Sequence, residues 1–199
     1  MTNITRPNTS TIVPPVTNAT WAALALKLAC EFASAGTHEE GGNNRGPEVA
    51  KFQALTGGRP GDPWCADFAV YVFTKAYALL MHLPVDIESL KRYTVAVKNR
   101  LFLPSGSCGE IEADAKKRGK FLSKDTEWGL IKPGYLVLFN WKGGLAPQHV
   151  GLVREAAEGV LKTVEGNTEA TEGGNQSDGD GVELRLRSYN VVVGYVATR

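Results

Sequence analysis

The order of the secondary-structure patterns constrains this sequence most: helical patterns come first, and strand patterns follow them. Apolar residues at helical spacing, Pro at first helical positions and Gly near helix ends predict helices over residues 18–36, 47–55, 63–80 and 107–119. Runs rich in β-branched and aromatic residues, joined by short turns that contain Gly, predict strands over residues 135–140, 149–154, 160–164, 182–188 and 191–197. This segregation is typical of an α+β fold, with N-terminal helices packed on an antiparallel sheet of about five strands.

A cysteine lies in the first turn of the third predicted helix, within Asp62-Pro63-Trp64-Cys65. Asp62 is a suitable N-cap, and Pro63 suits the first helical position. The free N–H groups and the positive end of the helix dipole favour a thiolate over a thiol at such a place. Cys65 is therefore a candidate nucleophile.

His149 begins a predicted strand and is a candidate general base for Cys65. The next strand carries Glu165 and Asn167, which are expected to project to the same side because strand residues alternate. Either could orient the imidazole; we prefer Glu165, with Asn167 as a second polar contact. Of the other histidines, His82 is expected to be a surface or capping residue, and His38 lies in a loop. The chain order is thus Cys, His and then Glu or Asn, as in papain-like proteases.

These motifs resemble those of CHAP domains, the cysteine, histidine-dependent amidohydrolases/peptidases. The resemblance covers about residues 20 to 197, through Trp64-Cys65-Ala66, Pro133–Phe139, His149-Val150-Gly151, Val164–Thr168 and an upstream stretch, Glu39–Val49. It implies a papain-like fold, with the nucleophile at a helix start packed on the sheet. It also implies hydrolysis of peptidoglycan through an acyl-enzyme. The bond would be the glycan–peptide amide (N-acetylmuramoyl-L-alanine amidase) or one in the stem or cross-bridge peptide (endopeptidase).

Three residues near the candidate nucleophile are expected to bind substrate: Trp64, Asn44 and Arg45. The last two belong to a glycine-rich loop, residues 39–45, that either lines a substrate groove, binds a cation or simply packs on the cysteine helix. We expect the backbone N–H of Cys65 to contribute to an oxyanion hole, because that group is free at a helix start.

Composition favours one catalytic domain and argues against a nucleic-acid partner. The chain has 199 residues, of which 43% are hydrophobic, enough for a single core. Its 22 Lys and Arg against 21 Asp and Glu give a net charge of +1, without a basic block that could follow a phosphate backbone. We expect a flexible arm over residues 1–17 and a single CHAP-like catalytic domain over residues 18–199. The expected state is a monomer that acts on bacterial peptidoglycan.

The first twenty residues lack the basic and apolar regions of a signal peptide. No run of about 18 apolar residues is present that could span a bilayer. We therefore expect synthesis in the cytoplasm, no membrane insertion, and action on the wall after release, export or as part of a phage particle. A phage endolysin or a secreted bacterial lysin or effector would fit this route.

The three cysteines, Cys30, Cys65 and Cys108, show neither a disulfide framework nor metal-binding spacing. Cys30 falls in the apolar stripe of the first helix, whereas Cys108 lies in a turn and is either inert or a second reactive thiol. The acidic run over residues 175–181 lacks the EF-hand spacing and predicts a hairpin turn. We expect no metal site and no cofactor.

Two other functions stay open. One is a cysteine peptidase or amidohydrolase that acts on a protein or a small amide outside the wall. The other is a catalytically silent wall-binding or phage-structural module that keeps the fold. Labelling of Cys65 by a thiol-directed electrophile separates the silent module from an enzyme.

Overall fold

A computed structural model describes residues 16–170 and 178–199, and in this part of the chain five α-helices precede the sheet. The predicted arm therefore falls largely outside the described residues. The helices are α1 (Asn18–Ser34), α2 (Pro47–Gln53), α3 (Cys65–Leu80), α4 (Ile87–Arg100) and α5 (Cys108–Lys117). The strands are β1 (Phe121–Ser123), β2 (Leu136–Phe139), β3 (His149–Ala157), β4 (Val160–Thr168), β5 (Gly181–Arg187) and β6 (Val192–Val196), with 3₁₀ turns at Trp128–Leu130 and Tyr189–Val191.

Within the described residues the strands form one sheet of six strands in the order β1-β6-β2-β3-β4-β5, and all neighbouring strands are antiparallel. The prediction of an α+β fold is confirmed. The sequence missed β1, which has only three residues. It also missed α4, which has a readable start: the Asp86 side chain accepts a hydrogen bond from the N–H of Ser89, at 2.9 Å.

Helix α1 packs closely against α3. The Thr17 side chain caps it by accepting from the N–H of Thr20, at 3.0 Å. Its buried face combines Trp21 with small alanines, which let the backbone of α1 come near α3. The indole N–H of Trp21 donates to the backbone carbonyl of Phe73 in α3, at 2.6 Å, so the one polar atom of this ring is satisfied in the core.

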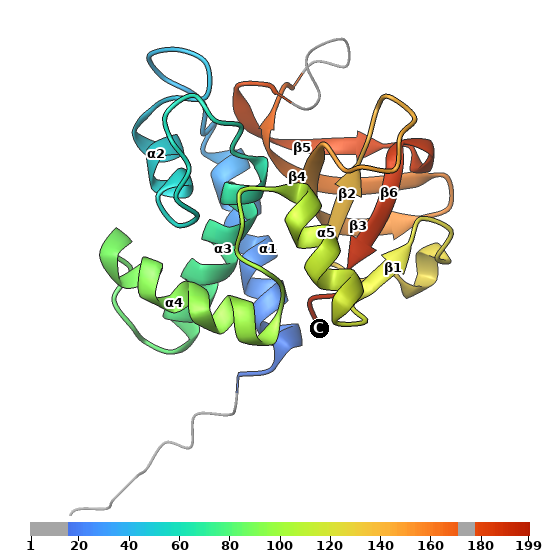
Figure 1. The fold of residues 1–199 in the computed structure, drawn as a ribbon, viewed down its shortest axis with the longest axis horizontal. Coiled ribbons are helices and arrows are strands. Elements are labelled where there is room, and N and C mark those ends of the chain that lie inside the picture. The colour runs from blue at the N-terminus through green and yellow to red at the C-terminus, as the bar shows by residue number, and fades with distance from the viewer. Residues whose placement is uncertain (1–15, 171–177) are drawn as a thin grey trace, which may run out of the picture.

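Helix α3 is the central helix, packed against α1, α2 and α4 as well as β3 and β4 (Figure 1). Most of its side chains are buried, as expected for a helix that is apolar nearly all round. Its first turns lie directly on β4: a Cβ atom at Gly166 would be 2.8 Å from the Phe68 side chain and from the Trp64 ring. This contact fixes the start of α3 against β4, the strand next to the β5 edge of the sheet.

The two faces of the sheet carry different clusters. Leu136, Leu138, Val150, Leu152 and Val164 face the helices and belong to the main core. The opposite face carries a smaller cluster that includes Val137, Phe139, Val153, Leu161 and Tyr195. Each fully buried side chain of this size stabilises the fold by about 1.5–3 kcal/mol relative to an exposed one.

Candidate active site

Cys65 is the first residue of α3, but the start of this helix differs from the predicted one. The N-cap is Trp64, with no side-chain cap, so the prediction of Asp62 as N-cap and Pro63 as first helical residue is wrong. Asp62 instead accepts a hydrogen bond from the N–H of Arg59, at 2.8 Å, within the preceding turn. Cys65 nevertheless lies where backbone N–H groups lack intrahelical partners.

His149 is fully buried at the start of β3 and is held by Glu165 of β4. The Nε2 atom of His149 lies 3.0 Å from Oε2 of Glu165. The same carboxylate accepts a hydrogen bond from the hydroxyl of Thr163. It also forms a bidentate pair with the guanidinium of Arg187, whose Nε lies 2.9 Å from Oε1. A buried carboxylate with this many donors keeps one position, and so does the imidazole that it holds.

Only a glycine fits at position 151, two residues after His149. A Cβ atom at this position would lie 2.5 Å from Cγ of Glu165, on the neighbouring strand. Any other residue would therefore displace the Glu165 carboxylate, which in turn holds His149.

The Cys65 thiol lies beside the His149 ring, close enough for each group to shift the pKa of the other. The Nδ1 atom of His149 is buried and has no hydrogen-bond partner in the described residues. Because Nε2 is occupied by Glu165, Nδ1 is the ring nitrogen that can exchange a proton with the thiol.

The pKa shifts at the site favour an ion pair between thiolate and imidazolium. A hydrogen bond from Cys108 holds the pKa of Cys65 well below its ordinary value. Burial opposes this shift, whereas His149 and the N–H of Val150 add to it. Burial opposes protonation of His149, but the neighbouring Cys65 and Glu165 outweigh it and raise its pKa to about 9. Burial likewise opposes ionisation of Glu165, yet Arg187 and His149 lower its pKa to about 2.

These charges compensate one another in a nearly dry site. A Cys65 thiolate, a His149 imidazolium, the Glu165 carboxylate and the Arg187 guanidinium sum to zero, and Arg187 itself is only 6% exposed. Burying an unpaired charge costs several kcal/mol, so each member of this set requires its opposite. The aromatic rings of Phe139 and Trp141 flank both cations and limit the access of water.

Asn167 does not lie beside Glu165, in contrast to the prediction. The pairing of β4 with β5 shifts between Gly166 and Thr168, and Asn167 adopts a φ of 58°, so the strict alternation of side chains ends there. In the amide orientation that satisfies both ends, Asn167 accepts from the N–H of Trp64, at 3.1 Å, and donates to the carbonyl of Gly179. It thereby fixes the chain just before Cys65, and in the described residues its side chain hydrogen-bonds to Trp64, Gly179 and Asn44.

Two of the three predicted substrate-binding residues are buried. Trp64 is 0% exposed, and its indole donates to Glu39 at 2.8 Å. Asn44 is 2% exposed, and its backbone N–H donates to the Glu39 carboxylate, at 2.6 Å, within the same loop. We correct both to packing roles: the glycine-rich loop packs on the cysteine helix. Arg45 is exposed, and its guanidinium lies near Gly61 in the turn before α3, where it can still meet a ligand.

The structure adds two residues to the predicted site. Arg187 comes from β5 and completes the Glu165 cluster. Cys108 comes from the start of α5, where its Sγ lies 3.8 Å from Sγ of Cys65. The hydrogen bond to Cys65 and burial raise the pKa of Cys108 well above its ordinary value.

The other two histidines stay apart from this cluster. His38 is exposed, bridges to Gly181 through its backbone, and has its Nδ1 atom 2.8 Å from the carbonyl of Gly36. His82 is exposed just after α3, with a φ of 53°, as expected for a residue that ends a helix.

A polar hollow of about 310 Å³ adjoins the start of α3. It is lined by Thr56, Asp62, Pro63, Asp67 and Gly106, among others. Burial, partly offset by a hydrogen bond from Thr56, raises the pKa of Asp67 to about 6. Two of its lining residues, Pro63 and Asp67, lie two positions before and after Cys65 in the chain. The hollow can accept a polar part of a ligand.

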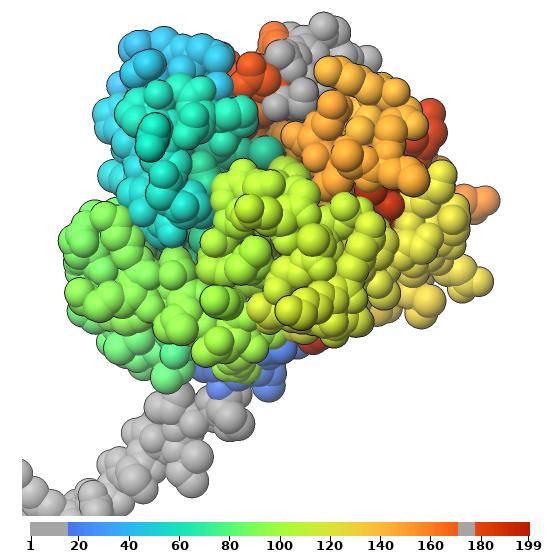
Figure 2. All heavy atoms as spheres, in the orientation of Figure 1, coloured from blue at the N-terminus to red at the C-terminus, as the bar shows by residue number. Residues whose placement is uncertain are grey.

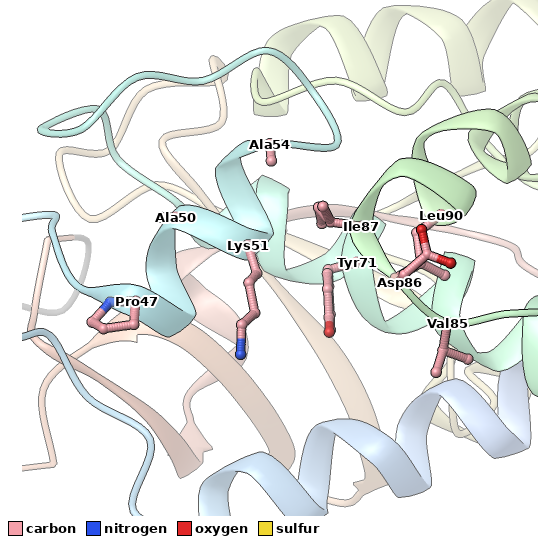
Figure 3. Close-up of a pocket in the computed structure, with 9 residues that line it drawn as sticks. All are labelled: Pro47, Ala50, Lys51, Ala54, Tyr71, Val85, Asp86, Ile87 and Leu90. Carbon is pink, nitrogen blue, oxygen red and sulfur yellow. The ribbon is translucent and has the colours of Figure 1, made fainter.

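A larger cleft, of about 480 Å³, lies elsewhere, between α2 and the start of α4 (Figure 3). Lys51, Tyr71 and Asp86 supply its polar groups, and its walls are otherwise apolar. It contains no cysteine or histidine, so we do not connect it with the chemistry of Cys65.

No family model, no curated protein and no solved structure matches the chain. Among residues 16–170 and 178–199, no cluster of His, Cys, Asp and Glu could hold a metal ion. Residues 175–177 of the predicted hairpin turn fall outside that part of the chain. None of the helices in it is long and apolar enough to cross a membrane.

Glu165→Gln is expected to lower activity on the order of 100-fold, because the amide can still orient His149 but no longer balances its charge. Asn167→Ala should chiefly lower thermal stability, since the Asn167 side chain hydrogen-bonds to Trp64, Gly179 and Asn44. Rates and melting temperatures of both variants check this division. An Asn167→Ala enzyme that melts normally but is less active than Glu165→Gln would make Asn167 the orienting residue.

Proposed function

We propose that the protein is a cysteine amidohydrolase or peptidase with Cys65 as nucleophile, His149 as acid and base, and Glu165 as the orienting residue. The observation that carries this proposal is the His149 ring, with Nε2 on the Glu165 carboxylate and Nδ1 left for the Cys65 thiol. A structural cysteine needs neither a lowered pKa nor a buried, charge-balanced imidazole.

The mechanism follows from these positions. The Cys65 thiolate attacks the carbonyl carbon of an amide, and the oxyanion that forms accepts from the free N–H of Cys65 at the start of α3. The His149 imidazolium gives its proton to the leaving amine, which leaves an acyl-enzyme. His149 then takes a proton from water, which attacks the thioester and releases the acid and the thiolate. Glu165 and Arg187 hold the ring in place throughout.

We propose peptidoglycan as the substrate, on the basis of the CHAP-like motifs. They are supported by a nucleophile at a helix start, packed on an antiparallel sheet whose next strands carry the base and its partner. The accessible groups near Cys65 are polar: the hollow at Asp67, and Arg45 beside Gly61. A peptide stem, with amides, carboxylates and amines, suits such a surface.

The test is digestion of purified cell walls, followed by mass spectrometry of the soluble products. An amidase releases intact stem peptides from the glycan, whereas an endopeptidase leaves shortened or uncrosslinked stems on the sugar. Loss of turbidity with either product pattern supports the proposal. Intact walls, together with cleavage of a protein or a small amide, would assign the chain to the alternative cysteine hydrolase.

The pH dependence separates the roles of Cys65 and His149. Hydrolysis needs a protonated His149, and its pKa of about 9 keeps the rate level through neutral pH and lowers it above about pH 9. Alkylation of Cys65 by iodoacetamide needs only the thiolate, so it should persist above pH 9. Parallel pH profiles of kcat/KM and of alkylation measure the difference. A kcat/KM that already falls as the pH rises through 6.5, the ordinary pKa of histidine, would contradict the ion pair.

The same shifts set the pH range of stability. The contribution of His149, whose pKa is raised from 6.5, is complete below pH 6.5 and is lost as the pH rises through about 9. The contribution of Glu165, whose pKa is lowered from 4.5, is complete above pH 4.5 and is lost as the pH falls through about 2. The fold should therefore be most stable between pH 4.5 and pH 6.5, where both contributions are complete.

A further inference from the structure

The nucleophile faces a second thiol. Cys65 and Cys108 are 43 residues apart in the chain, and their Sγ atoms are 3.8 Å apart. Each is the first residue of a helix, α3 and α5 respectively. Both are buried, with 4% and 7% of their surface exposed. Cys30, the remaining thiol, is half-buried on α1 and serves as an internal control.

The approach of the two thiols is built into the backbone. A Cβ atom at Gly106 would lie 2.8 Å from Oδ1 of Asp67, so the turn before α5 lies directly on the first turn of α3. The Ser107 side chain then caps α5 by accepting from the N–H of Glu110. Figure 2 shows this segment, in yellow-green, at the front of the molecule between the helical part and the strands. Two helix starts that are fixed in this way present their first side chains to each other.

We propose that Cys65 and Cys108 are a redox-modification site, at which a peroxide converts the two thiols into a reversible disulfide that blocks the nucleophile. The loss of activity rests on the proposed function, whereas formation of the bond does not.

The chemistry balances with hydrogen peroxide as the oxidant. The Cys65 thiolate attacks one peroxide oxygen, the O–O bond breaks, and hydroxide leaves, so that Cys65 becomes a sulfenic acid. The Cys108 sulfur then attacks Cys65 sulfur, an S–S bond forms, and the hydroxyl leaves as water with the Cys108 proton. The hydroxide is neutralised by the proton that His149 had taken from Cys65. In total, two thiols lose two electrons and two protons, and one peroxide becomes two waters. A dithiol such as dithiothreitol reverses the step by exchange.

The environments of the two sulfurs suit these different roles. The lowered pKa of Cys65 makes it the thiolate that meets the peroxide, and the raised pKa of Cys108 keeps it protonated until the sulfenic acid has formed. A disulfide needs an S–S distance of about 2.05 Å, so each sulfur has to move by roughly 0.9 Å if the movement is shared.

The experiment treats the full chain with hydrogen peroxide, blocks the remaining thiols with iodoacetamide, and digests it with trypsin without reductant. We expect peptide 52–75, which carries Cys65, linked to peptide 101–116, which carries Cys108, with two hydrogens lost. Dithiothreitol should separate the two peptides. In parallel, wall hydrolysis should fall by at least tenfold and return after dithiothreitol.

Matched variants locate the effect. Cys30→Ala should keep both the linked peptide and the recovery. Cys108→Ala and Cys108→Ser should lose the linked peptide, and peroxide should inactivate each, relative to its own untreated rate, in a way that dithiothreitol does not reverse. Without a resolving thiol the sulfenic acid proceeds to sulfinic and sulfonic acids.

The outcomes keep the two proposals apart. A wild-type chain that is inactivated without the linked peptide, or that links Cys30 instead, would overturn the disulfide while leaving the hydrolase in place. A linked peptide in a chain that never digests walls would support the disulfide and remove the proposed substrate.

Discussion

Cys65→Ala is expected to abolish wall hydrolysis, with a rate loss on the order of 10⁴- to 10⁶-fold. Removing one member of a covalent catalytic set costs nearly as much as removing all of it. The change deletes a single sulfur atom at a buried position, so the circular dichroism spectrum and the melting temperature should stay close to those of the unchanged protein. Initial rates on purified walls, measured beside thermal melts, give both quantities.

Two further variants make this result specific. Cys65→Ser keeps the size of the side chain but replaces the thiolate by a hydroxyl that His149 has to deprotonate, and it should also be inactive. Cys30→Ala changes a half-buried thiol on α1 and should keep full activity. A Cys65→Ala protein that retained more than a small fraction of the rate would remove Cys65 from the mechanism.

The predicted pairing of Cys65, His149 and Glu165 depended on local rules. A helix start and the alternation of two neighbouring strands can be read from short stretches of sequence. The structure brings these three side chains together because α3 packs on β3 and β4. The same rules failed where one residue breaks the period: the left-handed backbone at Asn167 ends the alternation that the sequence suggested.

Arg187 was not predicted, because its strand reverses the usual pattern. In β5, Leu184 and Leu186 are 45% and 68% exposed, whereas Arg185 and Arg187 are buried. Alternation alone would place the leucines inward. The arginines take the inner positions because β5 pairs with β4, where Glu165 offers Arg187 a buried counter-charge. The signal in the sequence is the pair of arginines at strand spacing, and only the pairing of the strands gives it meaning.

Cys108 shows the same limit at longer range. Its turn, Ser105-Gly106-Ser107-Cys108, predicted a helix start but not what that start faces. Its neighbour is set by the contact of Gly106 with Asp67, between segments that have no periodic relation in the sequence. Local patterns thus suggested the nucleophile, the base and the orienting residue. Arg187 and Cys108, which influence the charges of these three residues, are brought to the site by tertiary packing, and local sequence patterns do not predict it.

His149→Ala is expected to lower the rate nearly as far as Cys65→Ala, by about 10⁴-fold or more, because the base and the acid of both steps are lost. Glu165 and Arg187 remain paired in this variant, so the fold should persist. The pKa of Cys65 should rise once the imidazolium is gone, and iodoacetamide should then label Cys65 more slowly at pH 6. Slower labelling would show that the ion pair between His149 and Cys65 is lost, and not merely that the chain around position 149 has moved.

The other histidines provide the controls for this result. His38→Ala removes an exposed ring whose Nδ1 atom lies 2.8 Å from the Gly36 carbonyl, and the rate should change little. His82→Ala should lower stability by about 1 kcal/mol, since alanine is costly at a φ of 53°, and should leave the rate intact. Rates, melts and labelling of the three variants form one comparison. If His38→Ala were inactive and His149→Ala active, the base would be His38, and the buried contact of His149 with Glu165 would be structural only.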